Sequence, residues 1–446
     1  MLMSIGFTAG GEPSPHWSFT SLLISKPVTA LYRTWPALPW YAIYLYTAHF
    51  VASCILVFVA VRLLNAFPRS SLFVCLAALV SIQMPLLTQL QFTSAAFVLA
   101  TAAIALWVHA TLRGGSLVQI ATAAVLFGLA YNIRSQSAEG ALVFMLPIVV
   151  LAVVPALSKR QLGVLLAIPI AIGICALGPV LAEREYGNDA AWQSYNAYND
   201  VRGHLHHTPK LEDDGKLAEA IAAVGWSPVD LYMFKNWFFT DRDIFSQARL
   251  ERFREIRQWV VDQNTRSDPV QAVWESVSQS HYVFVLAIAL VLALCQSPRS
   301  WLFYGAYLLW GLGLIVVLIL LFRFPLHIAI PIALCLCVGF WLLGAITART
   351  NPPRRPAGLA RAVRGVAIAI ACVILVQSLL NARQYNDVNT QGRAAFVTLL
   401  KSLERIGKTA VTDEGPSDSR PRSPLFVLWG GYFPVQLLSP WTTAAD

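Results

Sequence analysis

The sequence predicts an all-α protein: a polytopic transmembrane helical bundle of about ten spans, with a helical extracytoplasmic loop and a small extracytoplasmic C-terminal tail. Two observations predict it. Of the 446 residues, 57% are hydrophobic and only 13% are charged, whereas soluble domains carry roughly 25% charged residues. The apolar residues also gather in long runs, and a helix of about 20 such residues crosses the hydrocarbon core of a bilayer. A soluble protein is therefore excluded.

Ten nearly uncharged runs are the expected spans. The stretch 71–112 contains no charge and is too long for one span, so Thr88, Gln89 and Gln91 are expected to form a hairpin between two helices. The expected spans are residues 41–63, 71–87, 93–112, 117–133, 139–157, 162–182, 281–296, 300–322, 325–346 and 365–381.

The basic residues of the connections predict the orientation, because cytoplasmic connections carry an excess of lysine and arginine. They recur in alternate connections, at Arg62 and Arg69, Arg113, Lys159 and Arg160, Arg299, and Arg349, Arg354, Arg355, Arg361 and Arg364. The alternation divides the chain into an outer N-terminal loop, six spans, an outer loop, four spans and an outer tail. These parts are residues 1–40, 41–182, 183–280, 281–381 and 382–446. Residues 1–40 would lie outside without a signal peptide or span to carry them, so we expect a first transmembrane helix upstream of Met1 in a longer protein.

The net charge of +9 follows from this topology. The segment 183–275 holds 16 of the 24 acids and 11 of the 33 basic residues, so its net charge is −5 and that of the remainder is +14. The positive charge follows the connections between spans and therefore indicates orientation. We expect a lipid bilayer as the partner and no nucleic acid, in a multi-pass protein of the inner (plasma) membrane.

Two helices are expected in the outer loop. Ser227–Asp230 is a capping box with proline at the first helical position, and Thr240–Asp243 is a second box. Apolar residues after the second box fall near one face, which suits a helix lying along the membrane surface. They are Phe245, Phe253, Ile256 and Val260. In the tail we expect a helix at 392–405 and a strand at 425–429.

No metal site is predicted. All seven cysteines lie in apolar stretches and are interpreted as small buried hydrophobic residues. The spacing of His204, His206 and His207 matches no strong metal motif, so solvated loop histidines are favoured, with a divalent cation left open as a cofactor.

Ionisable residues in the membrane zone are functional candidates, because burying one costs roughly 2.5–3.5 kcal/mol or more unless it is paired. On the outer side these are Arg134 and Arg323, with His327 one turn beyond Arg323. The planar fork of arginine suits a phosphate. Two structural interpretations stay open: Arg134 pairs with Glu139, and Arg323 and His327 mark a helix end at the headgroups.

The densest polar cluster of the outer loop is Tyr195–His207. Within it, Asp200 and Arg202 are the candidates for an outer-facing site. The N-terminal aromatic residues are interpreted mainly as an interfacial belt, and secondarily as a sugar-stacking surface. They are Trp17, Trp35, Trp40, Tyr41, Tyr44 and Tyr46.

Several motifs resemble a group of bacterial polytopic membrane proteins encoded among polysaccharide genes. The N-terminal run Gly6–His16 (GFTAGGEPSPH), then Phe19, Leu31–Tyr32 and Pro39–Tyr41, resembles their first outer loop. Further matches are Asn199–Arg202 (NDVR), Arg134, Arg323 with Pro325, and the tail run FVLWGGYFP at 426–434.

This group resembles the membrane-embedded C-type glycosyltransferases. The resemblance implies a polyprenyl-phosphate-linked sugar as donor and a glycan acceptor, in cell-surface polysaccharide or glycoconjugate synthesis. The acidic pair of these enzymes would lie before Met1. The resemblance implies that Arg134 and Arg323 bind the phosphate, with His327 close to Arg323. Asp200 becomes the candidate catalytic carboxylate, and with Arg202 it faces the acceptor or orders the loop. His16 and Glu12 are placed at the rim of the site.

Other functions stay open. A polysaccharide polymerase also has ten or more spans, a large outer loop and outer arginines. A transporter or flippase of lipid-linked sugars predicts broken helices in matching halves, but the proline-containing spans do not recur symmetrically. A purely structural membrane protein leaves the ordered outer loop unexplained.

Overall fold

The computed structural model describes residues 13–384 with gaps, and four isolated residues beyond them. The described residues are 13–63, 67, 69–114, 116–158, 165–207, 221–235, 241, 243–263, 280–294, 298–321, 326–350, 362, 365–384, 387, 390, 391 and 398. All regular secondary structure in these ranges is helical, so the predicted all-α class is confirmed. The chain divides into a larger unit (residues 1–210, 264–379 and 443–446) and a smaller one (residues 211–263 and 380–442).

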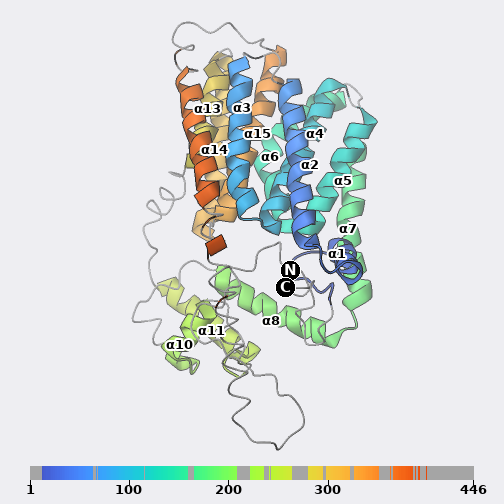
Figure 1. Ribbon diagram of the computed structural model, residues 1–446, viewed down its shortest axis with the longest axis vertical. Coiled ribbons are helices and arrows are strands. Elements are labelled where there is room, and N and C mark those ends of the chain that lie inside the picture. Colours follow the sequence, from blue (N-terminus) through green and yellow to red (C-terminus); the bar gives the residue numbers. More distant parts are fainter. Residues whose placement is uncertain are drawn as a thin grey trace, which may run out of the picture. The chain divides into compact units, whose positions relative to one another are not determined.

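The larger unit is a bundle of long helices (Figure 1). Its helices are α1 (Leu22–Thr34), α2 (Trp40–Leu63), α3 (Arg69–Thr88), α4 (Phe92–Arg113), α5 (Leu117–Ile133), α6 (Ser135–Ser158), α7 (Ala167–Tyr186), α8 (Ala190–His207), α13 (Ser280–Leu294), α14 (Pro298–Leu321) and α15 (Leu326–Thr350). A further helix, Gly365–Gln384, follows α15 in the chain.

Within the described ranges, eight helices are long and apolar enough to cross a membrane: α2, α3, α4, α6, α7, α14, α15 and Gly365–Gln384. Each of the ten expected spans overlaps a helix of the described residues, and the expected hairpin lies between α3 and α4. The multi-pass membrane character is thus confirmed. The count of ten stays a prediction, because α5 has only 17 residues and α13 only 15, fewer than the roughly 20 that a span needs. The orientation also stays a prediction.

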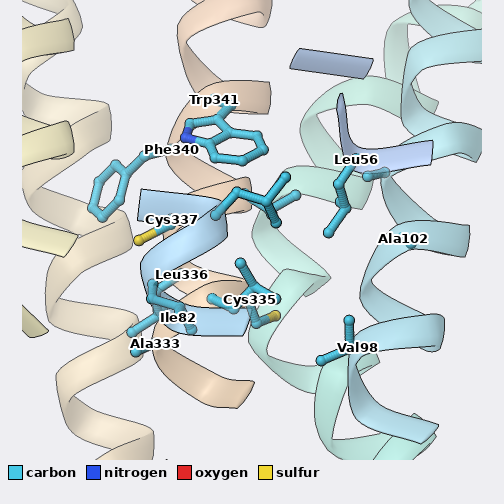
Figure 2. Close-up of a cluster of buried hydrophobic side chains, with 14 of the residues drawn as sticks. Leu56, Ile82, Val98, Ala102, Ala333, Cys335, Leu336, Cys337, Phe340 and Trp341 are labelled. Atoms are coloured by element: carbon cyan, nitrogen blue, oxygen red, sulfur yellow. The ribbon is translucent and has the colours of Figure 1, made fainter. Parts of the chain in front are cut away.

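The centre of the bundle is formed by α4 and α15, which are almost wholly buried and pack against most of the other spans. Alanines predominate in α4 and allow its neighbours to approach closely. Figure 2 shows residues of α15, among them Trp341 and Cys335, in one cluster with Leu56 of α2, Ile82 of α3, and Val98 and Ala102 of α4. Cys75, Cys335 and Cys337 are buried in this core, as predicted, whereas Cys54 and Cys372 are exposed on their helices.

A buried amide joins α5, α7 and the segment before α1. Asn132 Nδ2 donates to the carbonyl oxygens of Gly128 and Ile174, both at 2.9 Å. Asn132 Oδ1 accepts from Ser21 Oγ at 2.7 Å, and the Ser21 N–H donates to the Asn132 carbonyl at 2.9 Å. A Cβ at Gly178 of α7 would overlap Asn132 Oδ1 and lie 2.8 Å from Ser21 Cβ. Glycine at 178 is therefore what allows α7 to approach this amide.

Helix α1 lies inside the region expected to be an outer loop, where no helix was predicted. Its buried residues lie on one face of the helix: Leu22, Ser25, Val28, Thr29 and Tyr32. Together with Trp17 this face packs against aromatic residues at the start of α2, and Tyr32 Oη accepts from the Tyr41 N–H at 2.9 Å. Part of the expected aromatic belt thus packs inside the protein.

The smaller unit contains α10 (Pro228–Lys235) and α11 (Gln247–Gln263). The first capping box is confirmed: the Asp230 N–H donates to Ser227 Oγ at 3.2 Å, and the Ser227 N–H donates to Asp230 Oδ2 at 2.7 Å. The second helix start is wrong. Asp241 Oδ1 accepts from the N–H groups of Asp243 and Ile244 and closes a turn, so α11 begins only at Gln247.

The apolar face of α11 is used inside this unit. Phe245 and Phe253 are fully buried and contact Trp226 at ring-centroid distances of 5.4 and 4.9 Å, and Phe234 adds a third ring. Other side chains of the unit thus cover Phe245 and Phe253, so these two rings do not face a membrane. The expectation that the helix lies along a membrane surface stays a prediction. The expected tail strand at 425–429 and most of the tail helix at 392–405 lie outside the described residues.

Gly178→Ala is expected to destabilise the bundle by about 1–3 kcal/mol, because the added methyl group forces α7 away from Asn132. A lower thermal unfolding midpoint of the detergent-solubilised protein measures this loss. The matched control is Gly173→Ala on the same helix, where a Cβ meets nothing within 4 Å and alanine favours the helix. Equal midpoints for the two variants would contradict the close approach.

Candidate functional site

The candidate site lies where residues 13–21 pass over the ends of α5 and α7 and the start of α8. Several contacts besides those of Ser21 hold this segment and the adjoining α1 in place. Thr20 Oγ1 donates to the Ile133 carbonyl at 3.2 Å, and Ser18 Oγ lies 2.9 Å from Tyr195 Oη of α8. Lys26 of α1 forms a 2.8 Å ion pair with Glu185 of α7. Segments far apart in the sequence therefore meet at one end of the bundle.

Arg134 stands at the C-terminal end of α5 and its side chain lies against two aromatic rings. The Cζ atom is 4.3 Å from the ring centroid of Phe19 and 5.5 Å from that of Phe92. Both distances are in the range of cation–π contacts. Nε is buried and has no hydrogen-bond partner in the described part of the chain. The guanidinium is thus held by ring faces, which leaves its in-plane donors for other groups.

The alternative in which Arg134 pairs with Glu139 is wrong. The two are not among the ion pairs of the described residues. Glu139 is exposed, and the charge of its carboxylate acts instead on Tyr131 and Cys175.

Phe19 holds its ring over Arg134 from a strained backbone. Its φ of 70° lies in the left-handed region, and no other non-glycine residue of the described chain has a positive φ. A bulky side chain rarely adopts this conformation, and such outliers gather at functional sites. The ring itself is 49% exposed. Burial of the Phe19 ring therefore does not explain its left-handed backbone. The contact of the ring with Arg134 explains it better.

His16 lies in an aromatic box defined by Tyr186, Trp192 and Tyr195. Its ring centroid is 4.3 Å from that of Tyr186 and 4.8 Å from that of Trp192, which in turn stacks on Tyr195 at 5.1 Å. Nδ1 of His16 is 2.8 Å from Ser14 Oγ, and Nε2 is 3.7 Å from Asp189 Oδ2. The aromatic box thus combines flat apolar surfaces with a histidine and a carboxylate.

Asp189 was not among the expected site residues. Its Oδ1 accepts from the Trp192 N–H at 3.0 Å, so it is the N-cap of α8 and its second oxygen faces His16. The signal was present in the sequence, because an aspartate before two alanines and a tryptophan is typical of a helix start.

Arg202 lies on the same side of α8 as part of the aromatic box. Positions 192, 195, 199 and 202 recur at helical spacing, and Arg202 donates to Asn199 Oδ1. Burial lowers the pKa of the Arg202 guanidinium, and the nearby Tyr195 and Tyr198 act in the opposite direction. Tyr195 therefore connects this arginine to the aromatic box.

Asp200, the expected catalytic carboxylate, is exposed and falls on another side of α8. His327 is half-buried in the first turn of α15. The segment 16–21 therefore carries both His16, which contacts Tyr186 and Trp192, and Phe19, which contacts Arg134. Glu12 and Arg323 lie outside the described residues.

Among the described residues, no group of three histidine, cysteine or carboxylate side chains could hold a metal ion. The side chains of His204, His206 and His207 lie outside them, so the divalent cation stays a prediction. What the site offers chemically is an arginine for an anion, aromatic faces for an apolar or sugar ring, and a histidine–carboxylate pair that can hold a proton.

Comparison with known protein families, with curated proteins and with solved structures finds no match for this chain. The function is therefore argued from the geometry of this site and from the motifs in the sequence.

Trp192→Ala is expected to loosen residues 16–21, because it removes the ring that contacts His16, Tyr186 and Tyr195. An aromatic pair contributes about 0.5–1.5 kcal/mol, so hydrogen exchange of the backbone amides of this segment should accelerate roughly two- to tenfold. The control is Asn196→Ala, an exposed position on the same helix. Equal exchange in both variants would show that the aromatic box does not fix the segment.

Proposed function

We propose that this protein is a membrane-embedded glycosyltransferase that uses a polyprenyl-phosphate-linked sugar, and that Arg134 binds the phosphate. The observation that carries the proposal is the setting of Arg134, with its guanidinium against Phe19 and Phe92 and no ion pair to the nearby Glu139. It gives a positive charge at a bundle end whose donors a phosphate can use.

The charge distribution supports an anionic ligand there. No acid occurs between Glu12 and Glu139 in the sequence, so the spans nearest Arg134 on its N-terminal side supply no carboxylate. Arginine binds phosphate with two parallel hydrogen bonds, which are stronger than bonds between neutral groups. The phosphate of a lipid lies at the ends of spanning helices, and Arg134 stands at such an end.

The aromatic box supports a sugar beside that phosphate. In the proposed reaction the oxygen of an acceptor hydroxyl attacks the anomeric carbon, and the bond from this carbon to the phosphate oxygen breaks. The lipid phosphate leaves with the bonding electrons, and Arg134 stabilises its negative charge. A carboxylate takes the proton of the attacking hydroxyl. The sequence motifs favour Asp200 for this step, and the contact with His16 favours Asp189.

A polysaccharide polymerase would use the same site with a lipid-linked chain as the second substrate. A transporter would instead place its site near the bilayer midplane. One buried pair inside the bundle favours that alternative: His49 Nδ1 of α2 lies 3.1 Å from Gln83 Oε1 of α3, and polar groups within spans mark functional paths. Sugar transfer by the purified protein separates these functions.

Arg134→Gln is expected to weaken the binding of undecaprenyl phosphate, used as the probe, at least about tenfold, because a hydrogen bond to a charged group contributes about 1.5–3 kcal/mol. Titration of the purified protein in phosphatidylcholine nanodiscs measures the affinity. The control is Arg184→Gln, an exposed arginine in the last turn of α7. Unchanged affinity in Arg134→Gln, or equal losses in both variants, would reject the phosphate site.

Asp189→Asn and Asp200→Asn are expected to separate the two candidate bases. Asparagine is as good an N-cap as aspartate, so Asp189→Asn keeps the start of α8 and removes only the charge that faces His16. The variant that lacks the base should lose sugar transfer at least about 100-fold, with undecaprenyl phosphate binding unchanged. Full transfer in both variants would exclude both carboxylates.

A further inference from the structure

We propose that Arg62, Arg113 and Arg349 form a second site, which binds the phosphate headgroup of an anionic lipid at the end of the bundle away from α1. These arginines lie in the last turns of α2, α4 and α15. The C-terminal ends of the three helices lie at the same end of the bundle (Figure 1). The site does not involve Arg134 and does not rest on the proposed transfer reaction.

Arg113 is the centre of this arginine site. Its Nη2 donates to the Arg62 carbonyl at 2.8 Å, which fixes its guanidinium beside the last turn of α2. The charges of Arg113 and Arg349 are near enough to act unfavourably on each other. One N–H group of Arg113 therefore bonds to the last turn of α2. Its other N–H groups can bind an anion, which would also offset the charges of Arg62 and Arg349.

A buried imidazole with an unsatisfied nitrogen lies beside these arginines. His109 is one turn before Arg113, is only 4% exposed, and has a buried Nδ1 without a hydrogen-bond partner among the described residues. Its ring contacts Phe58 at 5.3 Å, and Phe58 also lies 5.7 Å from the Cζ atom of Arg62. The charges of Arg62 and Arg113 both act on His109. The imidazole thus lies near two cations, and its Nδ1 has no hydrogen-bond partner among the described residues.

The sequence leaves no nearby acid to balance these charges. The three arginines and the loops that follow their helices lie in the segments 13–138 and 276–386. These segments contain no aspartate or glutamate. The three arginines are exposed and lie at one end of the bundle, so their charges are offset by solvent ions or by an anionic group at the membrane surface. The phosphate of an anionic lipid supplies such a group at this depth, where basic pockets between spanning helices bind such headgroups.

The test is lipid retention by the full-length protein, measured by native mass spectrometry during titration with phosphatidylglycerol and, separately, phosphatidylcholine. The protein is expected to bind phosphatidylglycerol more tightly than phosphatidylcholine. Each arginine near an anionic surface increases the binding affinity roughly fivefold. Arg349→Gln and Arg113→Gln are therefore each expected to weaken phosphatidylglycerol binding by about fivefold, with phosphatidylcholine binding unchanged.

The control is Arg69→Gln, an exposed arginine at the start of α3, at the same end of the bundle, which is expected to leave lipid binding unchanged. Equal losses in Arg69→Gln and Arg349→Gln, or equal affinity for both lipids, would overturn the proposal. Displacement of phosphatidylglycerol by millimolar inorganic phosphate would overturn the lipid as the ligand. If Arg113→Gln does not fold, Arg349→Gln decides, because that side chain is exposed at a helix end.

Discussion

The buried amide of Asn132 is the interaction on which the end of the bundle near α1 depends. In an apolar interior an unpaired amide is costly, and each bond that satisfies this one comes from a different part of the chain. Its nitrogen reaches α7, its oxygen reaches the segment before α1, and its own backbone leads directly to Arg134. The position of the arginine, the path of residues 13–21 and the approach of α7 are therefore one linked arrangement.

Hydropathy alone predicts most of the bundle. A continuous run of apolar residues in lipid forms a helix, because a helix satisfies the backbone hydrogen bonds within the segment itself. Helices α1 and α8 were missed because each lies outside the apolar runs. In α1 the buried face mixes serine and threonine with apolar residues and contains Pro27 within the helix. In α8 the polar residues were interpreted as a loop, although the aspartate before it is a capping signal.

The candidate site could also be predicted only in part. Arg134 was identified as a candidate because few charged residues lie in or next to the spans, and this can be read from the sequence. Its aromatic partners were not predicted, because Phe19 and Phe92 come from segments that only the packing of α4 and α5 and the bonds of Thr20 and Ser21 bring together. The periodicity before and within α11 shows a related limit: it identifies apolar residues that need a partner, and for Phe245 and Phe253 that partner is Trp226.

The backbone of Phe19 is strained at the end of the bundle near α1. A left-handed conformation costs an ordinary residue about 1–2 kcal/mol. The contact of the Phe19 ring with Arg134 therefore requires an unfavourable backbone angle. An anion that approached Arg134 from this side would have to displace the ring. The relaxation of the φ angle would then offset part of the lost cation–π energy, so displacement of the ring costs less than the contact by itself indicates.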